Sequence, residues 1–181
     1  QVNKVVIEQL FYKLIHQPPE FEEKTIKELI ETDEAFSYIT EAAILCVGKV
    51  MHEDNREDAY RQIINELTFT LTEGHSIRFF TLSVDENIYF VYLNEECLSF
   101  EFYEKLTGAK EKLEELGISF VAGISNIHHS IYEIKNGFME AKNASPWKNT
   151  ALLKPNNSNQ LRYSAKHMLK KHRYLKGFSN Y

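Results

Sequence analysis

Two β-rich runs separated by three polar residues constrain the fold of this chain most strongly. Residues 76–84 and 88–94 are rich in β-branched and aromatic side chains, and Asp85, Glu86 and Asn87 lie between them. This pattern predicts a β-hairpin with a three-residue polar turn. The middle of the chain is therefore expected to form an antiparallel sheet.

Hydrophobic periodicity predicts the elements around this hairpin. Amphipathic helices are expected over residues 3–16, over a short segment ending near residue 32, and over residues 57–72, 102–116 and 131–141. Further strands are expected over residues 40–51, 118–125 and 150–154. The central order of strand, helix, strand, strand, helix, strand, helix, strand indicates an α+β fold. We expect a ferredoxin-like antiparallel sheet with helices covering one face.

The same pattern divides the chain into three parts. Residues 1–36 are predicted to be an N-terminal helical connector, residues 37–155 the α+β domain, and residues 156–181 a basic C-terminal linker and helix. The polar run at residues 155–159 marks the start of the linker.

Residues 40–154 resemble the GGDEF-like fold, in the degenerate form found in AraC-type response regulators. The resemblance depends on the hairpin at residues 79–92, on Ile-Ser-Phe-Val-Ala-Gly-Ile-Ser at residues 118–125, and on Phe-Met-Glu-Ala-Lys at residues 138–142. It implies a non-catalytic signalling and dimerisation domain of a cytoplasmic transcription regulator. Such a domain would form a homodimer and would reach DNA only through a downstream domain absent from this chain.

The residues that would serve cyclase chemistry are mostly missing. An active cyclase of this fold needs carboxylates on the first strand and on the hairpin to hold Mg²⁺, but residues 43–51 contain no acid and carry Lys49 instead. Ser83 and Val84 replace a glycine pair, while Asp85 and Glu86 retain two carboxylates. We therefore predict no enzyme activity and no cofactor or metal. A small-ligand or nucleotide-sensing pocket at Lys49, Asp85 and Glu86, and a divergent nucleotidyl cyclase, remain as alternatives.

Charge is distributed unevenly along the chain. Residues 1–140 contain 26 acidic and 12 basic residues, whereas residues 141–181 contain nine basic residues and no acidic one. Candidate contact residues in this basic tail are Arg162, Lys166, Lys170, Lys171 and Arg173. The tail could dock on the acidic body or on a second copy, contact nucleic-acid phosphates, or form a solvated linker.

The remaining signals describe an ordinary globular protein. No stretch approaches the roughly 18 consecutive apolar residues that a membrane helix needs, so no membrane contact is expected. Cys46 and Cys97 lie far apart without a metal-binding spacing, which predicts two buried thiols. His128 and His129 are predicted to begin a solvated loop rather than to bind a metal, because adjacent side chains point in different directions.

Overall fold

A computed structural model describes residues 2–52, 56–73, 78–93 and 100–144 of the 181-residue chain. The described elements follow the order α1, α2, β1, α3, β2, β3, α4, β4 and α5, with short 3₁₀ helices at Pro19–Phe21, Glu34–Tyr38 and Ile131–Glu133. The class is α+β, with antiparallel strands and helices on either side of them.

The described strands form one sheet in the order β2-β3-β1-β4. They are β1 (Ala42–Met51), β2 (Arg78–Val84), β3 (Asn87–Leu93) and β4 (Ser119–Ile124). Each neighbouring pair is antiparallel, and β1 lies between β3 and β4, with Leu45 opposite both Phe90 and Ile124. The β1-α3-β2-β3-α4-β4 succession is that of a split βαβ unit.

Strands β1 and β3 are apolar on both faces, and successive side chains alternate between two separate cores. In β3, Ile88, Phe90 and Tyr92 belong to one hydrophobic cluster, whereas Tyr89, Val91 and Leu93 belong to the other. Fully burying an apolar side chain of this size contributes about 1.5–3 kcal/mol. The continuous apolar run is therefore explained by a strand that is buried from both sides.

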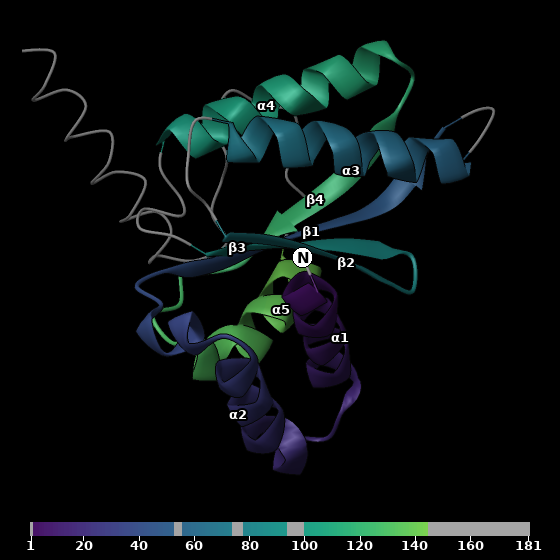
Figure 1. Cartoon of the computed structure of the whole chain (residues 1–181). Helices are drawn as coiled ribbons and strands as arrows, with labels where there is room; N and C mark the ends of the chain where they lie inside the picture. The colour runs from purple at the N-terminus through teal and green to yellow at the C-terminus, as the bar shows by residue number, and fades with distance from the viewer. Residues whose placement is uncertain (1, 53–55, 74–77, 94–99, 145–181) are drawn as a thin grey trace, which may run out of the picture.

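Helices α3 (Arg56–Thr72) and α4 (Phe100–Glu115) cover one face of the sheet (Figure 1). The helix α3 stripe of Ala59, Ile63, Leu67 and Leu71 is fully buried there, at the spacing that places side chains on one side of a helix. Gly117 ends this layer in the left-handed region, with φ of 75°.

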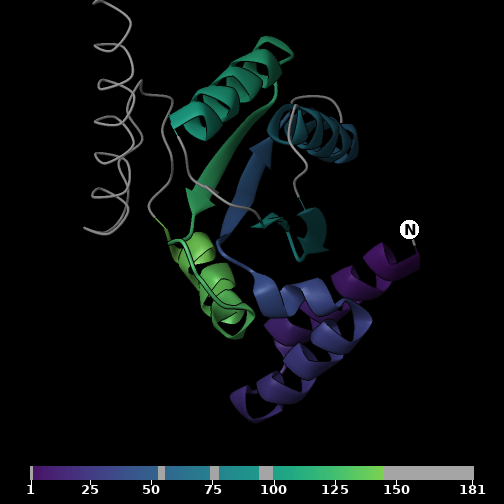
Figure 2. The same cartoon turned by 60° about the vertical axis from the view of Figure 1, so that its left-hand side comes forward.

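Helices α1 (Val2–His16), α2 (Glu22–Thr32) and α5 (Ile134–Asn143) cover the opposite face (Figure 2). Phe11 of α1 stands at the centre of this layer. Its ring centroid lies 5.7 Å from that of Phe80 on β2 and 5.9 Å from that of Phe138 on α5. Helix α1 thus packs directly on the sheet, and α2 packs on α1.

Several predictions can be compared with these elements. The hairpin, the flanking helices and the strands up to residue 124 are present, but the turn has two residues instead of three, because Asn87 pairs with Val84. Helices cover both faces of the sheet, not one. The predicted strand at 150–154 and the basic helix lie outside the described residues. The GGDEF-like fold assignment and the division at residues 36 and 155 stay predictions.

Within the described ranges, no helix is both long enough and apolar enough to span a bilayer.

Candidate functional site

The β2–β3 turn brings two of the predicted ligand residues to the surface. Asp85 and Glu86 are both exposed, and Asp85 has φ of 55°, in the left-handed region. Aspartate tolerates this conformation better than most residues because its short side chain can bond locally. The turn is therefore exposed to solvent, and it lies next to the end of β1.

Strand β1 is irregular where it approaches this turn. Gly48 pairs with Val121 and Met51 pairs with Ser119, so β1 has one residue more than β4 between these pairs. This is a β-bulge, and Lys49, the third predicted ligand residue, lies in it. A Cβ added to Gly48 would lie 2.6 Å from the side-chain oxygen of Asn87. The absent side chain at Gly48 lets β1 approach the start of β3.

An open depression of about 630 Å³ lies beside the bulge and the turn. Its lining residues come from the end of β1, the start of α3, the hairpin turn and the α4–β4 connection. They are Val50, Met51, His52, Arg56, Glu86, Gly117 and Ser119. Of the three predicted ligand residues, Glu86 lines this depression and Asp85 does not; the structure does not describe the side chain of Lys49.

Contacts between α3 and the turn hold one rim of the depression. The Arg56 guanidinium lies 3.5 Å from the Glu86 carboxylate, and the Tyr60 hydroxyl donates a 2.9 Å hydrogen bond to the Glu86 backbone carbonyl. The guanidinium carbon of Arg56, Cζ, also lies 5.7 Å from the centre of the Tyr60 ring. Sequence reasoning missed Arg56 and Tyr60, because a spacing of 26 residues or more separates them from Glu86.

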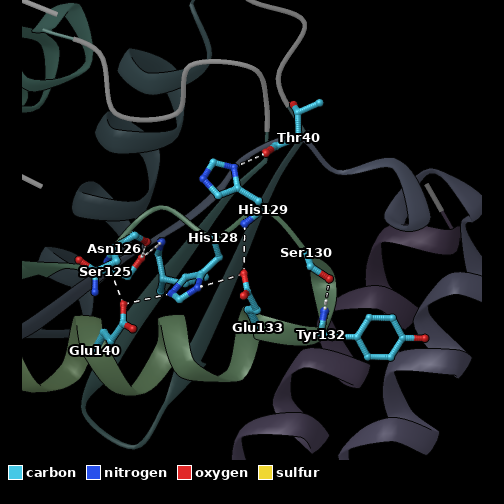
Figure 3. A network of polar contacts seen from close by, with 10 residues as sticks. Thr40, Ser125, Asn126, His128, His129, Ser130, Tyr132, Glu133 and Glu140 are labelled. Carbon is cyan, nitrogen blue, oxygen red and sulfur yellow. Dashed lines mark hydrogen bonds and ion pairs between the residues drawn. The ribbon is translucent and has the colours of Figure 1, made fainter. Parts of the chain in front are cut away.

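A second polar cluster lies on the other side of the sheet, where α5 meets the loop after β4 (Figure 3). The His128 side chain is only 11% exposed, with Nε2 at 3.1 Å from the Glu140 carboxylate and Nδ1 at 3.6 Å from the Glu133 carboxylate. His129 places Nδ1 2.8 Å from the Thr40 carbonyl oxygen. The prediction of a solvated loop start is therefore wrong for the His128 side chain, which is partly buried and paired with two carboxylates.

The cluster binds the loop to helix α5 through the backbone as well. The Asn126 amide donates to Glu140 at 2.9 Å, and the His129 amide donates to Glu133 at 3.2 Å. Both His128 nitrogens face carboxylates of the same chain, so neither is directed at a substrate, as a general base must be. Glu133 is the N-cap residue of α5, and Glu140 lies within the helix. We interpret the cluster as a structural fastening of α5.

Metal binding has no support in the described part of the chain. There, no group of three or more histidine, cysteine, aspartate or glutamate side chains is placed so that it could hold a metal ion. The His128 cluster, with one histidine and two carboxylates on opposite sides of its ring, does not have the convergent geometry that metal binding needs.

Cys46 is buried in β1 beside Tyr89. Burial raises the pKa of the Cys46 thiol to about 11, although a hydrogen bond from Tyr89 and the charge of Lys142 oppose this. Burial, followed by the interaction with Cys46, also raises the pKa of Tyr89. The prediction of a buried thiol is thus confirmed for Cys46. Because its raised pKa keeps the thiol un-ionised, Cys46 is also a poor nucleophile. Cys97 lies outside the described residues, as do Arg162, Lys166, Lys170, Lys171 and Arg173 of the basic tail.

Comparison with known proteins gives similarity at the C-terminal end. Residues 132–181 match the family model described as glycosyl transferase family 8 C-terminal. A lipopolysaccharide glucosyltransferase of Escherichia coli (strain K12) is 90% identical over 50 residues, which are 28% of this chain and 15% of that protein. A lipopolysaccharide 1,3-galactosyltransferase of Salmonella typhimurium is 46% identical over 50 residues, with the same coverage. The chain thus spans about 15% of the length of these curated relatives. No solved structure matches the chain.

These similarities correct the functional predictions. The relatives are glycosyltransferases, so the assignment to a degenerate GGDEF-like domain of AraC-type transcription regulators is wrong. The prediction that the chain is not an enzyme is overturned by the same finding, and the ligand-sensing and nucleotidyl cyclase alternatives are not supported by it. The wrong family assignment depended on short hydrophobic motifs. The pattern of residues 118–142 reflects the packing of a helix on a strand, and such packing does not indicate a function.

Proposed function

We propose that the chain serves the transfer of glucose to lipopolysaccharide, with residues 132–181 supplying the part that the matched segment supplies in the relatives. The observation that carries this proposal is the 90% identity over 50 residues to a lipopolysaccharide glucosyltransferase. Glucose is favoured over galactose because identity to the galactosyltransferase is only 46%.

The charge of the C-terminal segment supports an anionic acceptor. Residues 141–181 carry nine basic residues and no acidic one. Lipopolysaccharide bears phosphate groups, which Lys and Arg side chains attract at a distance set by the ionic strength. The strongly acidic body, in contrast, repels such an acceptor. The tail is therefore the part of the chain that we expect to bind it.

The start of the matched segment lies inside the described fold. Residues 132–143 cover the end of one 3₁₀ turn and the whole of helix α5, whose Ile134, Phe138 and Ala141 are buried against the sheet. The sheet domain thus holds the beginning of the segment in a fixed place, from which the basic tail continues.

A segment exchange tests the proposal. The 50 matched residues of the Escherichia coli glucosyltransferase are replaced by residues 132–181 of this chain, and incorporation of labelled glucose from a nucleotide-activated donor into lipopolysaccharide is measured. We expect the exchanged enzyme to transfer glucose at a rate comparable to that of the parent. The matched control is an exchange that carries Lys166→Gln, Lys170→Gln and Lys171→Gln, which we expect to weaken acceptor binding and to reduce transfer most at low salt, where the lysine charges are least screened.

A folded exchange protein that transfers no glucose would contradict the proposal. If the exchanged enzyme and its triple glutamine variant transferred glucose equally well, the proposed role of the basic tail would be contradicted. The proposed role of residues 132–181 in transfer would still stand. The predicted homodimer, the cytoplasmic location and the absence of membrane contact stay predictions, whereas the predicted route to DNA loses its basis with the regulator assignment.

A further inference from the structure

The depression beside the hairpin turn has the composition of a site for a polar, uncharged ligand. Its floor and rim combine the guanidinium of Arg56, the carboxylate of Glu86 and the Ser119 side chain with the exposed apolar side chain of Met51. Met51 is 63% exposed although it is a large apolar side chain at the end of a strand. The surface therefore offers hydrogen-bond donors, acceptors and an apolar patch within one hollow.

The charges of this hollow balance locally. Arg56 and Glu86 lie 3.5 Å apart, so the positive and negative groups offset each other. The Tyr60 hydroxyl contacts both the guanidinium of Arg56, at 3.4 Å, and the Glu86 carbonyl, at 2.9 Å. These contacts hold the rim before any ligand arrives, which lowers the entropic cost of binding. A balanced pair of this kind concentrates neither anions nor cations.

We propose that this depression binds a neutral saccharide unit through Arg56, Glu86 and Ser119. Each sugar hydroxyl both donates and accepts hydrogen bonds, so it can use the guanidinium and the carboxylate together. The C–H face of a sugar ring can lie on the exposed side chain of Met51. A volume of about 630 Å³ is within the size range of small-ligand sites. The assignment rests on the proposed function, because an enzyme acting on lipopolysaccharide must recognise its sugars.

Binding to the whole chain tests this site without any transfer reaction. The probe is the core oligosaccharide of lipopolysaccharide, deacylated and dephosphorylated, titrated into isotope-labelled protein and followed by amide chemical shifts. We expect saturable shifts at His52, Gly117 and Ser119, with an affinity that changes little between about 0.05 and 0.5 M salt, because no net charge is neutralised. Arg56→Met and Ser119→Ala should each weaken binding about fivefold to tenfold.

The control is Arg61→Met, an exposed arginine of the same helix that does not line the depression and is expected to leave affinity unchanged. Shifts that do not saturate, or equal affinity for Arg56→Met and the parent, would overturn the site. Strong weakening by salt would also overturn it, since it would show adventitious binding of an anion. If the oligosaccharide binds in this depression but the exchanged enzyme transfers no glucose, only the transfer proposal is contradicted. If the exchanged enzyme transfers glucose but the oligosaccharide does not bind here, only this site is contradicted.

Discussion

A Cβ atom built on Gly123 would lie 2.2 Å from the backbone carbonyl oxygen of Ala141, so β4 and the end of helix α5 meet where no side chain fits. The same hypothetical atom would lie 2.9 Å from the Cβ of Ala144. Neither neighbour can move easily, because one is helix backbone and the other is the residue that caps the helix. Strand β4 and helix α5 are therefore in close backbone contact at this glycine.

The first prediction follows from this contact. Gly123→Ala should lower the free energy of unfolding by about 1–3 kcal/mol, because the added methyl group forces α5 away from the sheet. Urea denaturation of the two proteins measures the difference. Gly108→Ala is the matched control: nothing lies within 4 Å of a Cβ there, inside helix α4, so it should stabilise by about 0.5–1 kcal/mol. Equal effects at the two glycines would contradict the close contact.

The second prediction concerns Glu140, which accepts hydrogen bonds from the Asn126 amide and contacts His128. Glu140→Ala leaves a partly buried amide without this acceptor and should cost about 1–3 kcal/mol in unfolding free energy. Glu115→Ala, at an exposed position on α4, should change stability by no more than about 0.5 kcal/mol. A double-mutant cycle with His128→Ala should give a coupling energy of at least about 0.5 kcal/mol. A coupling of zero would show that the His128–Glu140 contact does not fasten the helix.

The third prediction uses the strained position in the hairpin turn. Asp85 has φ of 55°, in the left-handed region that glycine adopts without strain and that most other residues adopt only at an energetic cost. We expect stability to rank Asp85→Gly above the parent and the parent above Asp85→Ala, with steps of up to about 1 kcal/mol. Thermal unfolding checks the order. If the alanine variant were the most stable, the left-handed conformation at this position would be wrong.

The fourth prediction is a pH dependence caused by Cys46. The pKa of its thiol is about 11 in the folded protein, against an ordinary value of 9.0. Between these values the unfolded chain loses the thiol proton while the folded chain keeps it, so stability falls as pH rises from 9 to 11. The expected loss from this group is about 2–3 kcal/mol. Below pH 9 the group contributes no pH dependence.

The measurement compares parent and Cys46→Ala across this range, both with Cys97→Ser, so that other titrating groups cancel. The difference in unfolding free energy should shrink as pH rises, because only the parent is penalised. A difference that stays constant from pH 8 to 11 would mean that the buried thiol titrates normally.

Local pattern predicted most of the sheet because the periodicity of each element survives in the fold. The stripe from Ala59 to Leu71 and the apolar run of β3 are visible in the sequence, and both are buried in the structure. The second helical layer was not predicted, since an apolar strand looks the same whether one or both of its faces are covered. Phe11 reveals the difference only through its contacts with Phe80 and Phe138.

The candidate site was predicted only in part. Glu86 was identified because the turn lies between two obvious strands, and it does line the depression. Arg56 and Ser119 belong to elements that approach the turn only after the chain has folded. Their place in the site therefore could not be predicted from local sequence spacing. His128 was misjudged for the opposite reason: its partners lie five and 12 residues further on, and only the path of the loop brings them to one ring.

Helix α5 gives the start of the matched segment an unusual position. Similarity to the glycosyltransferases begins at residue 132, yet the side chains of Ile134, Phe138 and Ala141 complete the core beneath the sheet. A gene fragment ending at residue 131 would encode a sheet with part of that core open to water. The boundary of the sequence similarity and the boundary of the folded core therefore differ by one helix, and a fragment that ended at the first would lose side chains that the second needs.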